Sequence, residues 1–192
     1  ARRVGSGLYC RFCCHGTRLM LGLAQFVVLA VGMLRIAELV LAHRNTRNLL
    51  ARGGQEFGRR HYPLFVLLHG GWLVAIFIAI PSDSPSNTVL LFVFVALQFC
   101  RLWVISSLGP YWTTRIISAP DFPRVVRGPY RWVKHPNYIV VTAEIAVLPI
   151  AFGAWEIAIL FSALNGGLLF WRIKIEEHAL AQRQGTSSEI VC

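Results

Sequence analysis

Charge is scarce in this sequence, and acidic residues are the scarcest part of it. Only 15% of the 192 residues are charged, whereas 55% are hydrophobic. A soluble domain of this length would be more polar. Nine acidic residues stand against nineteen lysines and arginines, which gives a formal net charge of +10. No basic stripe with interleaved aromatic residues accompanies this excess, so it favours anionic lipid headgroups over nucleic acid as the partner.

Metal-binding and haem-attachment motifs are missing as well. Cys10, Cys13 and Cys14 crowd the stretch CRFCCH. Haem attachment requires C-x-x-C-H, and Cys14 occupies the position of that histidine. No second pair of ligands follows at the spacing of a zinc site. We therefore interpret these cysteines as free thiols in a flexible arm, and predict no metal site.

The apolar residues gather in five stretches, at 19–42, 64–80, 88–108, 137–152 and 155–171. Spanning a bilayer takes about 20 residues, and the first three stretches meet that length. The last two are shorter, and Pro149 and Gly153 oppose one continuous helix through both. We therefore predict a helical hairpin there. The fold class predicted is an all-α integral membrane bundle of about five transmembrane helices.

The basic residues have a pattern along the chain. The segment 43–63 carries five arginines and one acid, and 109–135 carries four arginines, one lysine and one acid. The segment 81–87 carries only Asp83. The positive-inside rule places the two basic loops in the cytoplasm, with the N-terminus outside and the C-terminus inside. Arginines among the first 18 residues oppose this orientation, and we give the two loops more weight.

Several polar residues lie inside the apolar stretches, among them Arg35, Glu38, His69, Arg101, Glu144, Glu156 and Asn165. An ionisable residue in a membrane indicates function by default, and a structural pair between helices is the alternative. Arg35 and Glu38 are three residues apart and share a helix face, which favours a structural pair. For Arg101 and Glu144 both interpretations stay open.

Two polar clusters flank the predicted hairpin. In KHPNY, Pro136 suits a first helical turn, whose free N–H groups and dipole can receive a carboxylate or phosphate. In RIKIEE, Arg172 and Glu176 are four residues apart. Glutamates oppose the dipole of a helix C-terminus, so they indicate a cationic ligand, with a solvated helix end as the alternative. Because a hairpin is antiparallel, both clusters are expected to meet at the cytoplasmic rim.

These same residues carry a family resemblance. GPYRWVKHPNY, followed by a hairpin and RIKIEEHAL, resembles the isoprenylcysteine carboxyl methyltransferase family, in particular its small bacterial and archaeal members. ARGGQEFGRRHYP and SSLGPYWTTRIISAP are also similar to stretches of those members, so the resemblance covers roughly residues 50 to 180. It implies a membrane enzyme that transfers a methyl group from S-adenosylmethionine to a lipophilic acceptor.

The resemblance also implies site residues. Those expected to bind the cofactor are Tyr130, Lys134, His135, Pro136, Asn137, Tyr138, Glu176 and Glu177. For a carboxylate acceptor, Arg172 is the expected partner, because a guanidinium meets a carboxylate with two hydrogen bonds. For a hydroxyl acceptor, Glu144, His135 and Glu176 are candidate bases. Trp112 and Asn165 are expected to contact the acceptor.

Four segments follow from this interpretation: an arm at 1–18 whose order the sequence leaves open, three transmembrane helices at 19–108, a catalytic region at 109–180, and a disordered tail at 181–192. Lys134 and Val140 stand where the prenylcysteine enzymes usually have arginine and glycine. These departures weigh more against a prenylcysteine acceptor than against methyl transfer. Bacterial members of this type resemble O-methyltransferases of long-chain polyketides, so the acceptor is expected to be either prenylcysteine-like or long-chain polyketide-like. Two alternatives are a membrane reductase of the sterol-reductase type that uses NADPH, and a non-enzymatic membrane scaffold. The oligomeric state is not indicated.

Overall fold

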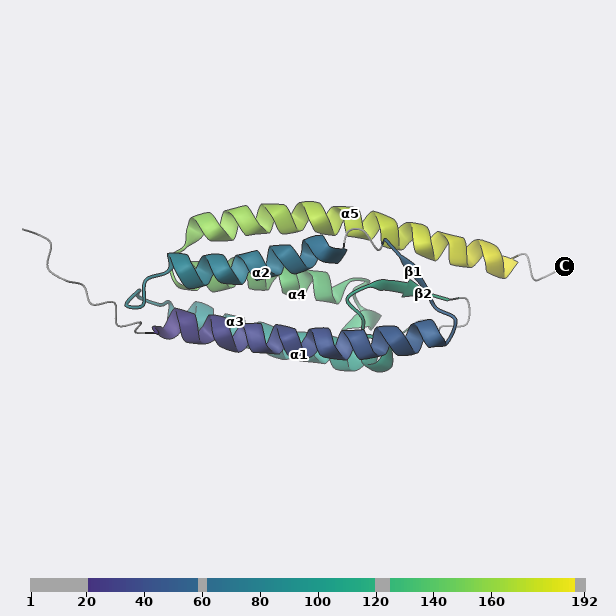
Figure 1. Ribbon diagram of the computed structural model, residues 1–192, viewed down its shortest axis with the longest axis horizontal. Helices are drawn as coiled ribbons and strands as arrows, with labels where there is room; N and C mark the ends of the chain where they lie inside the picture. The colour runs from purple at the N-terminus through teal and green to yellow at the C-terminus, as the bar shows by residue number, and fades with distance from the viewer. Residues whose placement is uncertain (1–20, 59–61, 120–124, 189–192) are drawn as a thin grey trace, which may run out of the picture.

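A computed structural model of the chain describes residues 21–58, 62–119 and 125–188. Over these residues the chain forms a bundle of helices that run side by side (Figure 1). The helices are α1 (Leu23–Ala51), α2 (Tyr62–Ala79), α3 (Thr88–Leu108), α4 (Pro136–Ala151) and α5 (Trp155–Ser188). The predicted arm at 1–18, with its cysteines, lies outside the described residues.

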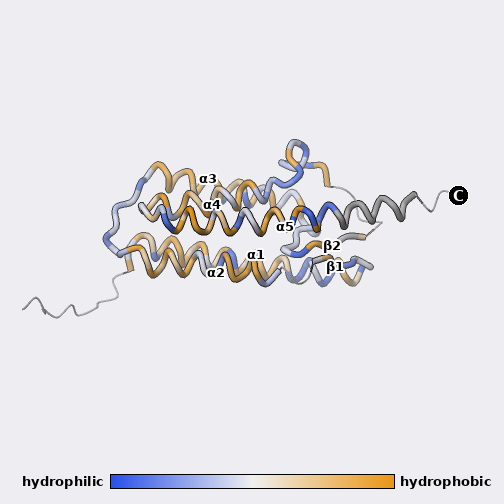
Figure 2. Tube along the Cα trace, turned by 90° about the horizontal axis from the view of Figure 1, so that it is seen from above, coloured by the Kyte–Doolittle hydropathy of each residue, from blue (hydrophilic) through white to orange (hydrophobic). Residues whose placement is uncertain are grey.

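The bundle has the surface of a membrane protein. Helices α1, α2, α3 and α5 are each long and apolar enough to cross a bilayer. Large apolar side chains point outward along them, including Ile78, Phe92 and Val89, which are 76%, 71% and 70% exposed. Figure 2 shows apolar residues along the helices and hydrophilic ones gathered near β1 and β2. The predicted all-α membrane bundle is confirmed.

Helix α4 is the shortest of the five α-helices in the described part of the chain. Its 16 residues rise by about 24 Å, which is less than the hydrocarbon core of about 30 Å. It packs against α3 on one side and α5 on the other. The hairpin predicted from Pro149 and Gly153 is present, because α4 ends at Ala151 and α5 starts at Trp155. Gly153 makes this turn with a φ of +76°.

The connections alternate between the two ends of the bundle (Figure 1). The connection from α2 to α3 and the turn from α4 to α5 share one end, where the Asn87 N–H donates to the Ala151 carbonyl at 2.7 Å. The other end carries β1, β2 and two 3₁₀ turns, η1 (Gly109–Tyr111) and η2 (Gly128–Arg131). We call this second end the polar end. It contains both of the loops that the sequence shows to be basic.

Helix α1 continues beyond the position expected from hydropathy. The apolar stretch ends at residue 42, but the helix ends at Ala51, so part of the predicted loop at 43–63 is helical. Asn45 explains the extension, because its buried amide donates to the carbonyls of Gly109 and Trp112 at 3.1 and 2.9 Å. These tertiary bonds anchor a polar helical turn that sequence periodicity alone assigns to a loop.

Helix α5 is likewise longer than its apolar stretch. It runs to Ser188 and so includes residues 181–188 of the segment expected to be a tail. That segment begins with Ala-Gln-Arg-Gln, which are good helix formers. The remaining residues, 189–192, lie outside the described part of the chain.

Two short strands join the loops of the polar end. Strand β1 (Gln55–Phe57) follows α1 and pairs antiparallel with β2 (Ile116–Ser118), which follows α3. The Arg115 guanidinium donates to the Glu56 carboxylate at 2.8 Å and lies 4.7 Å from the centroid of the Tyr62 ring. The pairing therefore fixes the connection after α3 against both α1 and α2.

Gly128 fixes η2 against α3, and its replacement is expected to destabilise the fold. Its φ of +57° favours glycine, and an added Cβ would overlap the Ser107 hydroxyl. Gly128→Ala therefore combines backbone strain of about 1–3 kcal/mol with overpacking of about 1–3 kcal/mol. Gly153→Ala is the matched control, since its φ is also positive but no atom stands near the added Cβ. Thermal unfolding midpoints in one detergent should fall further for Gly128→Ala, and equal midpoints would contradict this account.

Candidate active site at the polar end

The two polar clusters that flank the hairpin meet at the polar end. The Tyr138 hydroxyl, on α4, donates to Glu176 Oε2 of α5 at 2.7 Å. Arg172 Nε donates to the same hydroxyl at 2.9 Å. The His135 ring stacks on the Tyr138 ring, with centroids 5.0 Å apart, and His135 Nδ1 lies 3.8 Å from Glu176 Oε2. KHPNY and RIKIEE are therefore parts of one site, as the hairpin geometry predicts.

A cavity of about 240 Å³ opens beside this junction, and we call it the outer cavity. Polar and aromatic side chains from η2, α4, α5 and the connection after α3 surround it. Its lining comprises Leu108, Tyr111, Trp112, Thr113, Arg115, Ile116, Ile117, Tyr130, Lys134, His135, Asn137, Tyr138, Arg172 and Glu176. The outer cavity is therefore lined by one carboxylate, three arginine or lysine side chains and four tyrosine or tryptophan side chains.

The inner cavity, of about 130 Å³, lies between the helices. Apolar groups such as Leu39, Phe65 and Val141 form much of its wall. Its remaining lining is Arg35, Glu38, Tyr62, Val66, His69, Arg101, Trp112, Thr113, Thr114, Asn137, Tyr138, Leu169 and Arg172. Five residues line both cavities: Trp112, Thr113, Asn137, Tyr138 and Arg172. The two spaces therefore adjoin at the level of Tyr138.

Two buried polar atoms at this shared wall lack partners. Asn137 Oδ1 and Trp112 Nε1 make no hydrogen bond to any part of the chain that the structure describes. Leaving a buried donor or acceptor unpaired costs about 1–3 kcal/mol. One acceptor and one donor are thus available to a polar ligand at the junction of the cavities.

Tyr130 adds a neutral hydroxyl to the outer cavity. Burial raises the pKa of its phenol well above the ordinary value, and the nearby Glu176 carboxylate raises this pKa further. The phenol therefore keeps its proton at physiological pH. It can donate a hydrogen bond to a ligand without adding charge.

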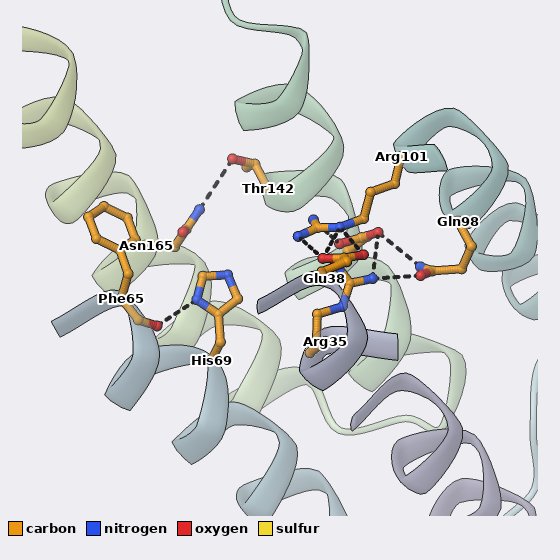
Figure 3. A network of polar contacts seen from close by, with 9 residues as sticks. Arg35, Glu38, Phe65, His69, Gln98, Arg101, Thr142 and Asn165 are labelled. Carbon is orange, nitrogen blue, oxygen red and sulfur yellow. Dashed lines mark hydrogen bonds and ion pairs between the residues drawn. The ribbon is translucent and has the colours of Figure 1, made fainter. Parts of the chain in front are cut away.

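An ion-pair cluster of Arg35, Glu38, Arg101 and Glu144 lies deeper in the bundle (Figure 3). Arg101 Nε and Nη2 donate to the two oxygens of Glu38 at 2.9 and 2.8 Å, and Nη1 donates to Glu144 at 3.0 Å. Arg35 donates to Glu38 at 3.0 Å, so the predicted pair on α1 is confirmed. Gln98 bridges Arg35 and Glu144 at 2.7 and 2.9 Å. The cluster joins α1, α3 and α4.

The structure brings most of the expected cofactor residues together. Around the outer cavity stand Tyr130, Lys134, His135, Asn137, Tyr138 and Glu176. Pro136 is buried as the first residue of α4. Glu177 is exposed, and it lines neither cavity in the described part of the chain. It therefore lies beside the site but outside its wall.

Two expected catalytic or acceptor residues are placed differently. Glu144 belongs to the ion-pair cluster, where both of its oxygens are engaged. Asn165 is fully buried, and its amide donates to the Thr142 hydroxyl at 3.3 Å. Neither residue lines the inner or the outer cavity as described. Trp112 and Arg172, in contrast, line both.

Several site residues were not identified from the sequence. Thr113, Thr114 and Arg115 reach the cavities because β2 pairs with β1. The short β-branched run TRIIS was the only signal of that strand. His69 was identified only as a polar residue inside an apolar stretch, and its place in the cavity wall depends on how α2 packs.

The bundle defines an integral membrane protein with two adjoining cavities near its polar end. Residues 89–182 match the model of the isoprenylcysteine carboxyl methyltransferase (ICMT) family. The chain is 36% identical over 152 residues to the uncharacterized protein YpbQ of Bacillus subtilis (strain 168), covering 77% of this chain and 90% of that protein. The chain belongs to the isoprenylcysteine carboxyl methyltransferase family, a family of membrane methyltransferases.

A second relative is more distant. It is an uncharacterized protein of Haemophilus influenzae (strain ATCC 51907 / DSM 11121 / KW20 / Rd), 26% identical over 156 residues, which cover 77% of this chain and 89% of that protein. No solved structure matches the chain significantly.

Proposed function

We propose that this protein transfers a methyl group from S-adenosylmethionine to an oxygen atom of a lipophilic acceptor. The observation that carries the proposal is the pair of adjoining cavities. The outer cavity is polar and lies at the end of the bundle, whereas the inner cavity lies among apolar side chains between the helices. A water-soluble donor and a membrane-dissolved acceptor each have a matching space, and the shared wall brings them together.

The lining of the outer cavity fits S-adenosylmethionine. When bound, this cofactor supplies a methyl group carried on a positively charged sulfur. The Glu176 carboxylate suits its ammonium group, and Lys134 with the start of α4 suits its carboxylate. The face of the Tyr138 ring attracts a cationic sulfonium. Asn137 Oδ1 and Trp112 Nε1 offer hydrogen bonds that no described residue fills.

The inner cavity is proposed to hold the reacting end of the acceptor. Its apolar wall suits a long-chain or prenyl substituent, and Arg172 stands where the cavities adjoin. Methyl transfer in line requires the oxygen and the methyl carbon to approach within about 3–3.5 Å. We propose that Arg172 and Tyr138 hold that geometry, since both side chains border both spaces.

The polar end is proposed to face the cytoplasm. It carries the arginine-rich loops, and the opposite end carries the loop with Asp83. The positive-inside rule then puts the outer cavity on the side where soluble cofactors are available. This orientation agrees with a C-terminus inside.

Cofactor choice is tested by ligand-dependent stabilisation. S-adenosylhomocysteine is expected to raise the unfolding midpoint of the detergent-solubilised protein, because a ligand that binds only the folded state adds about 2.7 kcal/mol at a hundredfold excess over Kd. NADP⁺ is expected to leave the midpoint unchanged. Stabilisation by NADP⁺ alone would replace the proposal with a reductase. Stabilisation by neither ligand would favour a scaffold.

Glu176→Gln is expected to weaken S-adenosylhomocysteine binding by about 10- to 100-fold. The change removes a charge-assisted bond to the ammonium group, of the kind worth about 1.5–3 kcal/mol. The amide can still accept the bond from the Tyr138 hydroxyl, so the fold should be kept. Isothermal titration calorimetry measures the change, and the exposed neighbour Glu177→Gln is the matched control. Equal affinity in both variants would remove Glu176 from the cofactor pocket.

A further inference from the structure

His69 is the one imidazole that lines the inner cavity within the described residues. It lies on α2 and is half-buried, and Figure 3 shows its ring beside the ion-pair cluster. Its Nδ1 lies 2.7 Å from the backbone carbonyl of Phe65, one turn earlier. A carbonyl oxygen only accepts hydrogen bonds, so Nδ1 is the nitrogen that carries the proton.

This bond determines what the other ring nitrogen can do. In the neutral imidazole, Nε2 then carries the lone pair. The bond through Nδ1 is the one side-chain hydrogen bond that His69 makes to the described residues, so Nε2 has no such bond. Figure 3 shows it on the edge of the ring away from the Phe65 carbonyl, toward the space between α2 and the cluster. A fixed ring with a free acceptor in the wall of a cavity has the arrangement that a general base requires.

The charge balance of the cavity favours an acceptor that arrives neutral. The ion-pair cluster contains two arginines and two glutamates, so its formal charges cancel. It offers no uncompensated cation to a carboxylate that enters the bundle. Burying an unpaired charge is costly, whereas a hydroxyl needs only one hydrogen bond.

The remaining cation of the cavity wall already has partners. Arg172 donates from Nε to the Tyr138 hydroxyl at 2.9 Å and from Nη1 to the Thr114 carbonyl at 2.9 Å. A carboxylate that binds with two parallel bonds through Nε would have to displace Tyr138. A hydroxyl acceptor leaves these bonds in place.

We propose that His69 is a catalytic base of this protein and that the acceptor is a lipophilic phenol or enol. This inference rests on the methyl transfer proposed above. The acceptor's O–H bond breaks and its proton passes to His69 Nε2. The oxygen's electron pair forms the new O–C bond to the methyl group. The C–S bond breaks with its electrons on sulfur, which leaves neutral S-adenosylhomocysteine. The imidazolium returns its proton to water when the products leave.

The ionisable groups that line the inner cavity around His69 come from each packed helix. They are Arg35 and Glu38 on α1, Tyr62 on α2, Arg101 on α3, Tyr138 on α4 and Arg172 on α5. Within this set His69 is the group that offers a neutral ring nitrogen as an acceptor with no hydrogen bond to the described residues.

The kinetic test uses two acceptors that differ only in ionisation. One is a long-chain 4-alkylphenol, which is protonated at mildly alkaline pH, and the other is the matching alkyl-nitrophenol, which is already ionised. His69→Gln keeps a donor for the Phe65 carbonyl but removes the base. The kcat for the alkylphenol is expected to fall about 100-fold, and the kcat for the nitrophenol to change less than about threefold. His43→Gln, at an exposed position of α1, is the control.

A binding measurement without turnover completes the test. With S-adenosylhomocysteine bound, the absorbance of the alkyl-nitrophenol reports its ionisation. The pH at which half of the bound nitrophenol is ionised is expected to be about one unit lower in the wild type than in His69→Gln, because the imidazolium stabilises the phenolate. Equal losses of kcat with both acceptors, or equal midpoints, would overturn the role of His69. If the wild type methylates neither phenol while binding S-adenosylhomocysteine, the hydroxyl acceptor is excluded. If it does not bind S-adenosylhomocysteine, the proposed function itself fails.

Discussion

Arg101→Met is expected to lower the free energy of unfolding by about 3–5 kcal/mol, because it leaves buried carboxylates without their partner. Arg101 makes bonds to both Glu38 and Glu144, and its side chain is only 9% exposed. Methionine fills a similar volume but offers no donor. Within the bilayer, the charge left behind has no water to solvate it. Unfolding titrations of the protein in lipid–detergent bicelles measure the loss.

The double variant Arg101→Met/Glu144→Leu separates charge from packing. The single change leaves the cluster with a net negative charge, whereas the double change leaves the neutral pair of Arg35 and Glu38 at 3.0 Å. Most of the lost stability is therefore expected to return, by about 2–4 kcal/mol. A double variant less stable than Arg101→Met would show that the cluster acts through packing.

Arg172→Lys is expected to reduce turnover by about 100- to 1000-fold, which is the cost of losing a fixed donor at a reacting oxygen. Arg172 bridges the Tyr138 hydroxyl and the Thr114 carbonyl at the wall shared by the two cavities. Lysine keeps the positive charge but cannot hold both bonds in the same plane. Single-turnover methyl transfer to a lipophilic acceptor gives the rate. Calorimetry with S-adenosylhomocysteine should show affinity within a few-fold of wild type.

Lys174→Ala provides the comparison on the same helix. Lys174 is exposed, its ammonium lies 4.5 Å from the centroid of the Phe170 ring, and it lines neither cavity as described. Turnover should therefore stay at the wild-type level. A similar loss in Lys174→Ala and Arg172→Lys would assign the effect to the cationic surface of α5 and not to the site.

Hydropathy and charge carried the prediction of the fold. The stretch 88–108 matches α3 residue for residue, because its apolar run begins after Asn87, whose side chain caps the helix by accepting from the Leu90 N–H at 3.2 Å. The end of α1 could not be obtained in this way. It depends on Asn45 and its contacts with residues more than sixty positions away, and hydropathy contains no information about such pairs.

The candidate site likewise has residues whose placement follows from local sequence properties and residues whose placement depends on long-range contacts. The meeting of His135 with Glu176 followed from the antiparallel geometry of a hairpin, which is a local property of the sequence. The placement of Glu144 did not follow from such a property. The sequence left catalysis and a structural pair both open for this residue, and its engagement depends on Arg101 and Gln98 from another helix. The place of His69 in the cavity wall also could not be predicted from the sequence, since it depends on the packing of α2 against α5 and α1.

The short α4 has a consequence for the proposed transfer of a methyl group to a lipophilic acceptor. Its 16 residues fall about 6 Å short of the hydrocarbon thickness. If the turn after α4 lies at one surface of the bilayer, the first residue of α4 lies below the level at which α3 and α5 leave the hydrocarbon. In the proposed reaction, the soluble methyl donor would then reach the depth of the acyl chains. The lipophilic acceptor would keep its tail dissolved in lipid, so that no extraction step is needed.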